Sequence, residues 1–199
     1  MKRCVIVGGA DINNYEYIKN CLHNDDFVVF CDSGLKHLEY LQVTPGLIVG
    51  DFDSHKNPNL DVETIVLPCE KDDTDTVYAV KEAIKRGFDE FLLIGVIGGR
   101  LDHTLGNVSI LLHLESLGKK GKIIDDYSEM EIVSKEPAFI DDSYAFFSLL
   151  NRLGESTRSD DVAIAVRLFI VGAKKTGNHA GVVFFCFEFK ALVFVFVHG

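Results

Sequence analysis

Short apolar runs alternate with segments of helical periodicity along residues 1–125 of the chain. Each apolar run contains several consecutive hydrophobic residues, which is typical of strands that are buried on both faces. The segments between them repeat apolar positions every three or four residues, as at Val77, Val80 and Ala83, and this spacing predicts helices. Strands are predicted at residues 3–7, 27–31, 47–49, 64–67, 91–97 and 122–124, and helices at residues 15–22, 35–41, 76–86 and 105–117.

This alternation predicts an N-terminal α/β domain of Rossmann-like type, with a parallel sheet that is covered by helices on both faces. Ligands of such sheets bind in the crevice at the carboxyl ends of the strands. The residues that directly follow each predicted strand are therefore the first candidates for a functional site.

The pattern changes after about residue 130, where strand-like stretches follow at 145–149, 162–171, 182–189 and 191–197. Phe185, Phe187 and Phe189 alternate with other residues, as in a strand with one buried face. These stretches predict a small antiparallel β domain, a β-sandwich, and divide the chain into domains at 1–130 and 131–199. Because uncovered Phe-rich strands invite aggregation, burial against a partner subunit is expected.

Composition and charge limit the partners. Hydrophobic residues make up 47% of the 199 residues, enough for a sizeable core, and the formal net charge is −10. Without a basic stripe, nucleic-acid binding is not expected. The five cysteines form no C-x-x-C pair and no secretory pattern is visible, so free thiols and a cytoplasmic location are expected. The apolar run at 182–197 is too short for a membrane-spanning helix and contains Glu188 and Lys190, so no membrane association is expected.

Three short acidic segments follow predicted strands or precede predicted helices: GDFDS at 50–54, KDDTD at 71–75 and GGRLDH at 98–103. If the fold brings them together, several carboxylates share a small volume. Two carboxylates ~5 Å apart repel by roughly 3 kcal/mol at an effective dielectric constant near 20, so such a group requires a cation. Carboxylate oxygens suit Mg²⁺, which completes its coordination with phosphate oxygens and water, and the sequence therefore predicts a Mg–nucleotide site.

Each of the first two segments has a second interpretation. At an extended strand end, Asp51 and Asp53 would point to the same side and face one cation, but such a pair is also typical of an Asx turn in a surface loop. Residues 72–75 precede a predicted helix and could cap it, but a cap needs only one carboxylate or Thr, so three carboxylates favour a functional role. Lys71 either contacts a phosphate as a point charge or offsets its acidic neighbours.

The third segment follows the most apolar predicted strand. Two glycines there allow the backbone to approach phosphates at a helix N-terminus, and the guanidinium of Arg100 suits phosphate oxygens. Asp102 is a candidate metal ligand or proton acceptor, and His103 is a candidate phosphate contact, although a His beside an Asp is more often structural. Gly8 and Gly9, after the first strand, form either a second phosphate approach or a simple turn.

Together with CDSGL at 31–35 and PGLIVG at 45–50, these segments resemble the thiamine pyrophosphokinase family in residues, order and separation over residues 1–133. Members of that family transfer pyrophosphate from ATP to thiamine, giving thiamine diphosphate and AMP. The resemblance implies an α/β domain followed by a β-sandwich, acting as a homodimer with sites at the subunit interface.

The resemblance also implies roles for individual residues. Mg²⁺ and the ATP phosphates would be held by Asp51, Asp53, Asp75 and Asp102. The nucleotide would be contacted by Asp32, Ser33, Lys71, Asp72, Thr74, Arg100, Asp102, His103, Thr104 and Asn107. The thiamine hydroxyl would attack the β-phosphorus in line, with Asp75, Asp102, Arg100 and His103 as the catalytic set and one of the two aspartates taking the proton.

After residue 133 the resemblance is loose, at residues 146–150 and 172–174, and beyond Lys175 it is poor. The chain contains no Trp, the residue that this family often places over the thiamine ring. Either a Phe takes that place or the acceptor pocket differs. Three alternatives follow: a Mg-dependent nucleotide pyrophosphohydrolase, a kinase of another small alcohol, and a non-catalytic sensor of thiamine or nucleotide. Turnover of ATP with and without thiamine distinguishes them.

Overall fold

A computed structural model describes residues 2–52, 60–68 and 73–133, together with the backbone of strands at 138–141, 144–151, 181–184 and 191–197. The chain divides into two compact units, Met1–Asp126 and Tyr127–Gly199. Among the described residues, no helix has both the length and the apolar character needed to cross a membrane.

The first unit contains a parallel sheet, and its six strands are hydrogen-bonded in the order β4-β3-β2-β1-β5-β6. These strands are β1 (Arg3–Val7), β2 (Phe27–Cys31), β3 (Pro45–Gly50), β4 (Thr64–Val66), β5 (Glu90–Ile94) and β6 (Lys120–Ile124). The chain winds outward from β1 through β2, β3 and β4, and then returns to the other side of β1 at β5. This change of direction creates a topological switch point between β1 and β5, where ligand crevices of open α/β sheets form.

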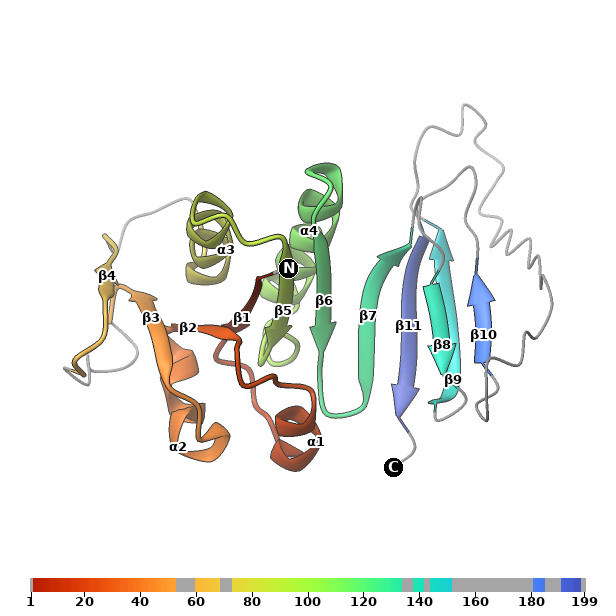
Figure 1. The fold of residues 1–199 in the computed structure, drawn as a ribbon, viewed down its shortest axis with the longest axis horizontal. Helices are drawn as coiled ribbons and strands as arrows, with labels where there is room; N and C mark the ends of the chain where they lie inside the picture. The colour runs from red at the N-terminus through yellow and green to blue at the C-terminus, as the bar shows by residue number, and fades with distance from the viewer. Residues whose placement is uncertain are drawn as a thin grey trace. The chain divides into compact units, whose positions relative to one another are not determined.

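Helices connect the strands and cover both faces of the sheet. They are α1 (Tyr15–Asn20), the 3-10 helix η1 (Asp32–His37), α2 (Leu38–Leu41), α3 (Asp75–Lys85) and α4 (Leu101–Ser116). Figure 1 shows α3 and α4 beside each other and α1 and α2 beside each other on the opposite side of the sheet, in agreement with the contacts within each pair. The predicted Rossmann-like α/β architecture of the N-terminal part is confirmed.

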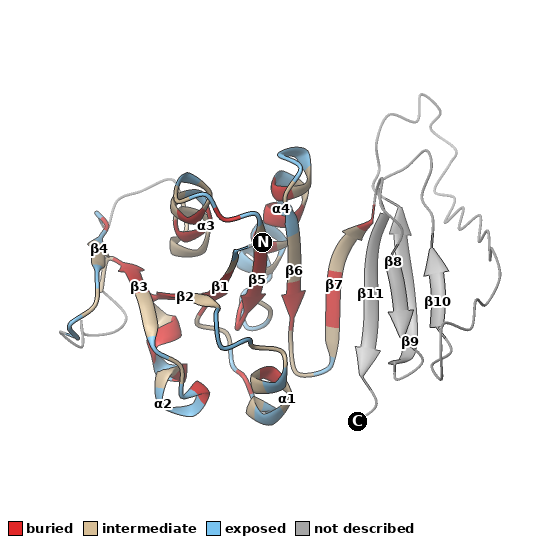
Figure 2. Ribbon diagram, in the orientation of Figure 1, coloured by how far each residue is buried: buried red, intermediate tan, exposed pale blue. Residues whose placement is uncertain are grey.

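The strands at the centre of this unit are almost completely buried, as Figure 2 shows for β1 and β5. Val5 and Val7 of β1 belong to a core cluster that also contains Ile18 of α1. Successive side chains of a strand point to opposite faces, so the neighbouring Cys4 and Ile6, both fully buried, lie on the face that α3 contacts. Two buried faces explain why these strands have no polar alternation.

The second unit contains antiparallel strands. β11 (Ala191–Val197) lies between β7 (Ser128–Val133) and β9 (Tyr144–Asn151), and it pairs antiparallel with both. β8 (Ala138–Asp141) pairs antiparallel with β10 (Gly181–Phe184). The predicted strand at 162–171 and the alternating phenylalanines at 185–189 lie outside the described residues.

Several element boundaries differ from the prediction for identifiable reasons. β5 ends at Ile94 rather than at residue 97, because Gly95 has φ of 61° and turns the chain out of the sheet. α4 begins at Leu101, four residues before the predicted start, because the polar residues of its first turn are exposed and leave no apolar signal. The predicted helix at 35–41 is instead divided between η1 and the single turn of α2.

Candidate functional site

The loops after β1 and β5 contact each other at the switch point. The backbone N–H of Gly8 donates to the carbonyl of Ile94 at 2.9 Å, and the N–H of Ala10 donates to the carbonyl of Gly95 at 2.7 Å. A Cβ on Gly8 would lie only 2.6 Å from the Gly95 oxygen, closer than real Cβ atoms come to such an atom. Glycine is therefore required at position 8 by this close approach of two backbones.

The loops after β1 and β2 are packed with similar closeness. A Cβ on Gly9 would overlap the side chain of Ser33, and a Cβ on Gly34 would overlap the carbonyl oxygen of Val7. Gly8 and Gly9 are thus more than a simple turn, because they allow the first residues of η1 to lie against the end of β1.

Three carboxylates meet at the carboxyl ends of the next strands. Asp32 follows β2, Asp51 follows β3, and Asp75 is the first residue of α3. One carboxylate oxygen from each lies within 4.8 Å of the others. Asp32 is only 2% exposed, and the other two are partly buried. We refer to these three residues as the acidic triad.

The electrostatics of the acidic triad favour a bound cation. At 4.8 Å each pair of charges repels by roughly 3 kcal/mol at an effective dielectric constant near 20. The same environment acts on Cys31, next to Asp32 in the chain: burial and, to a smaller extent, the charge of Asp75 raise the pKa of its thiol to about 12. Three hard oxygen donors match the preference of Mg²⁺, so the residues present fit this ion.

A glycine also fixes the geometry of the acidic triad. A Cβ on Gly50 would lie 2.5 Å from the Cβ of Asp32 and 3.1 Å from its Cα. Directly after Asp51, Phe52 has φ of 57°, in the left-handed region that bulky residues rarely adopt. The backbone at Phe52 is therefore not extended, and the alignment of Asp51 with Asp53 through strand alternation stays a prediction. Asp53 itself lies outside the described residues.

A second acidic group has a structural explanation. His23, Asp25 and Asp26 also have ligand atoms within 4.8 Å of one another, but His23 and Asp25 are exposed. Asp26 accepts two hydrogen bonds from the guanidinium of Arg3, both at 2.7 Å, and one from the backbone N–H of His23 at 2.7 Å. This group ties the loop before β2 to β1.

The segment after β5 presents charged groups on the surface. Arg100 donates from Nε to Oδ1 of Asp102 at 3.2 Å and from Nη2 to Oδ2 at 2.5 Å. The hydrogen bonds from Arg100 lower the pKa of Asp102 to about 2, and the pairing raises that of Arg100. His103 is exposed in the same helical turn. Among the described residues, Asp102 does not belong to a group of carboxylates that lie within 4.8 Å of one another.

Two neighbouring residues fix the shape of this segment. Asn107, which is 6% exposed, donates from Nδ2 to the carbonyl of Val96 at 2.8 Å and so ties α4 to the loop after β5. The hydroxyl of Thr104 accepts from the N–H of Gly98 at 3.3 Å and donates to the carbonyl of Arg100 at 3.1 Å. These bonds hold the loop at residues 98–100 against the first turn of α4.

The start of α3 combines both sequence interpretations. Thr74 is the N-cap, and its hydroxyl accepts from the N–H of Val77 at 3.3 Å, so the helix-cap interpretation is confirmed for this residue. Asp75, at the following position, belongs to the acidic triad. Lys71 and Asp72 lie outside the described residues.

The structure adds Asp32 to the carboxylates that were expected to share a cation. From the sequence, Asp32 was expected only as a contact of the nucleotide. Its position directly after a buried strand was the available signal, since Asp51 stands in the same relation to β3. His37 was not a candidate at all, because a single His within a short apolar helix pattern is indistinguishable from a core residue.

Comparison with known proteins is consistent with this site. The family model of the thiamin pyrophosphokinase catalytic domain matches residues 18–124. The thiamine pyrophosphokinase of Bacillus subtilis (strain 168) is 28% identical over 138 residues, which are 66% of this chain and 64% of that protein. The match thus spans slightly less than two thirds of the length of that relative.

Solved structures of similar fold include several thiamin pyrophosphokinases. A crystal structure of the Bacillus subtilis thiamine pyrophosphokinase has a TM-score of 0.73 at 17% identity, with 100% of each chain covered. The thiamin pyrophosphokinase of Geobacillus thermodenitrificans gives 0.69 at 20% identity, covering 99% of this chain and 98% of the other. That of Candida albicans gives 0.64 at 15% identity, covering 99% and 89%.

Proposed function

Because the chain belongs to the thiamin pyrophosphokinase family, we propose that it transfers a pyrophosphoryl group from ATP to the hydroxyl of thiamine, releasing AMP. The observation that carries this proposal is the acidic triad, which lies within the region that the family model matches. Three carboxylates in one partly buried volume favour a metal–phosphate ligand over a neutral one.

Asp32, Asp51 and Asp75 would hold Mg²⁺, and Asp53 and Asp102 are proposed to contribute to the same metal–phosphate assembly. When bound, the ion supplies charge neutralisation for the transferred phosphates. The chain's own residues do the positioning. The glycine loops after β1 and β5 allow close backbone approach, and Arg100 offers a planar pair of donors to phosphate oxygens.

The remaining nucleotide contacts are proposed for residues on either side of these loops. Ser33 lies against Gly9 at the start of η1, and Thr104 and Asn107 shape the segment that carries Arg100 and His103. The same role is proposed for the cap residue Thr74 and for the preceding residues 71 and 72. When the nucleotide binds, a phosphate would replace Asp102 as the partner of the Arg100 guanidinium.

A carboxylate has to accept the proton of the attacking hydroxyl. Asp75 is the better candidate, because it belongs to the acidic triad proposed to hold the metal and phosphates, whereas Asp102 does not. In-line attack on the β-phosphorus would then require that the thiamine hydroxyl approach the acidic triad next to Asp75.

We assign the acceptor site and dimerisation to the second unit. A β-sandwich is proposed for residues 131–199, with the chain acting as a cytoplasmic homodimer. The antiparallel pairing of β7, β11 and β9 is consistent with that architecture. No role in binding nucleic acid or membranes is proposed.

The deciding experiment is incubation of the purified protein with Mg–ATP, with and without thiamine, while AMP and thiamine diphosphate are both measured. Equal, thiamine-dependent formation of the two products is expected. Asp51→Asn is expected to lower that rate by roughly 100-fold or more, because it removes a metal ligand. Asp25→Asn, in the exposed second acidic group, is the matched control and is expected to retain activity.

Each alternative gives a different result. AMP that forms at the same rate without thiamine would indicate a pyrophosphohydrolase or another acceptor. Binding of Mg–ATP without any AMP would indicate a sensor. Normal turnover by the Asp51→Asn variant would overturn the assignment of the acidic triad as the metal site.

A further inference from the structure

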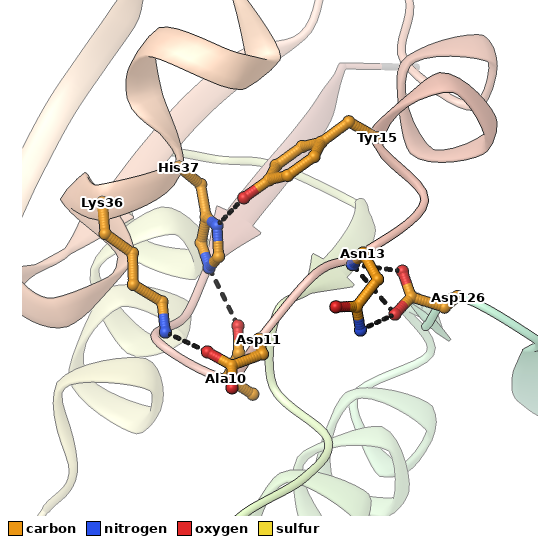
Figure 3. A network of polar contacts seen from close by, with 7 residues as sticks. All are labelled: Ala10, Asp11, Asn13, Tyr15, Lys36, His37 and Asp126. Atoms are coloured by element: carbon orange, nitrogen blue, oxygen red, sulfur yellow. Dashed lines mark hydrogen bonds and ion pairs between the residues drawn. The ribbon is translucent and has the colours of Figure 1, made fainter.

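His37, the last residue of η1, is a buried histidine with both ring nitrogens hydrogen-bonded. Its side chain is 1% exposed. Nε2 lies 2.8 Å from the carbonyl oxygen of Ala10, and Nδ1 lies 2.7 Å from the hydroxyl of Tyr15 (Figure 3). These contacts connect η1 with the chain between β1 and α1.

The two partners determine the protonation state of the ring. A carbonyl oxygen only accepts, so Nε2 must carry a hydrogen and donate to Ala10. In the neutral ring Nδ1 is then the acceptor, and the Tyr15 hydroxyl donates to it. Burial lowers the pKa of His37, which favours this neutral tautomer.

Both backbone polar groups of Ala10 are hydrogen-bonded. Its carbonyl accepts from His37, while its N–H donates to the carbonyl of Gly95 at 2.7 Å. One histidine thereby restrains the loop after β1 against the turn that leads from β5 into the Gly98–Arg100 segment. At its N-terminal end, η1 begins with Asp32 of the acidic triad. The next residue, Ser33, lies against Gly9.

The charged groups around the ring are paired with residues other than His37. Lys36 is paired with Asp11 at 2.6 Å, and this pairing lowers the pKa of Asp11. Asp126 accepts from the backbone N–H groups of Asn13 and Asn14, at 2.8–3.0 Å, and from the side-chain amide of Asn13 at 2.9 Å. Figure 3 shows these contacts flanking the ring without reaching its nitrogens.

We propose that His37 is a positioning residue for the phosphates of the nucleotide, acting through Ala10 to hold the glycine loop at residues 8–10 in place between η1 and the β5 turn. This proposal rests on the proposed function only in taking the ligand to be a Mg–nucleotide. His37 touches neither the acidic triad nor any reacting group in this assignment. Its effect is to keep two loops and the start of η1 in one arrangement.

Protonation of the ring would change its contact with Tyr15. A doubly protonated His37 donates from both nitrogens, so the Tyr15 hydroxyl would have to turn its hydrogen away and accept from Nδ1 instead of donating to it. Lys36 disfavours the charged ring, whereas Asp11 and Asp126 favour it, and burial outweighs them. Burial therefore keeps the ring in the neutral state, in which Tyr15 donates to Nδ1 and Nε2 donates to the Ala10 carbonyl.

The test is the dissociation constant for Mg–ATP, measured by calorimetry without thiamine at about pH 8, where a histidine is neutral. His37→Phe keeps the ring volume but removes both hydrogen bonds, and we expect a roughly tenfold or larger rise in the constant. His37→Gln keeps a donor that reaches the Ala10 carbonyl, so most of the affinity should return. His113→Phe, at an exposed histidine near the end of α4, controls for a change of residue type.

Amide hydrogen exchange of residues 8–11 gives a readout that does not depend on the nucleotide. Faster exchange is expected in His37→Phe and near-native exchange in His37→Gln. If His37→Phe folds and binds Mg–ATP as the unmodified protein does, the proposal is wrong. An equal loss in His37→Gln and His37→Phe would also overturn it, since only packing would then matter.

Thiamine diphosphate formation by the unmodified protein is measured in parallel, which separates the two proposals. If that product is absent but Mg–ATP binding responds to His37→Phe, the acceptor assignment fails and the role of His37 stands. If the unmodified protein binds no Mg–ATP, both proposals fail.

Discussion

Arg100 and Asp102 form a side-on ion pair across a single intervening residue, with Nη2 of Arg100 2.5 Å from Oδ2 of Asp102. Both side chains are mostly exposed, so the pair is available to be opened by a ligand at little cost. An incoming phosphate would replace the carboxylate as the partner of the guanidinium. Asp102 therefore keeps the Arg100 guanidinium oriented until an anionic ligand displaces it.

Removing the guanidinium should change the titration of Asp102. Its pKa is lowered to about 2, so any stabilisation from the pair is present above pH 3.8 and is lost as the pH falls toward 2. In Arg100→Gln the midpoint of the Asp102 carboxyl carbon, measured by ¹³C NMR, is expected to rise toward 3.8. A midpoint that stays near 2 would show that the ion pair is not the cause.

Replacing Asp32 with Asn should have opposite effects with and without the metal. Without Mg²⁺ the variant loses repulsion within the acidic triad, and its free energy of unfolding should rise, on the order of 1 kcal/mol. At a Mg²⁺ concentration 100 times the native dissociation constant, the unmodified protein gains about 2.7 kcal/mol, whereas a variant with tenfold weaker binding gains about 1.4 kcal/mol. Urea unfolding with EDTA and with Mg²⁺ measures both effects. An Asp25→Asn control should change neither, and an Asp32→Asn variant that keeps the full metal-dependent gain would contradict the site.

Two glycine-to-alanine changes should act in opposite directions. Gly50→Ala places a Cβ 2.5 Å from that of Asp32, so Asp32 has to shift and a loss of roughly 1–3 kcal/mol is expected, together with weaker Mg²⁺ binding. Gly106→Ala lies within α4, where an added Cβ has no neighbour within 4 Å, and should stabilise the protein by roughly 0.5–1 kcal/mol. Chemical denaturation of both variants provides the comparison. A stabilised Gly50→Ala variant with native metal binding would show that the acidic triad tolerates displacement.

Stability should depend on the protonation of His37. Because its pKa is lowered in the folded protein, the unfolded chain binds the proton first as the pH decreases. The free energy of unfolding is thus expected to be at its full value above about pH 6.5 and to fall as the pH drops toward the folded pKa. His37→Gln should remove this part of the slope below about pH 6.5. An identical slope in the variant would assign the acid sensitivity to other groups.

The sequence by itself determined the parallel α/β architecture of the first unit. Its strands are buried on both faces, and unbroken apolar runs such as residues 3–7 and 27–31 record that burial directly. It also showed carboxylates at a strand end and a helix start, where Asp51 and Asp75 were expected to share a cation. Local periodicity and the position of a residue after a strand are properties of neighbouring residues, so a sequence displays them.

Only the tertiary structure decided which side chains meet. Asp32 joins Asp51 and Asp75 because β2 and β3 end, and α3 begins, at the same edge of the sheet, although the first and the last are 43 positions apart. Phe52 turns the chain directly after Asp51, which local alternation did not indicate. His37 contacts Ala10 across 27 positions, and its neutral state depends on burial that no local pattern reports. Burial and contacts between distant residues arise from the packing of strands and helices, and packing is a property of the whole fold.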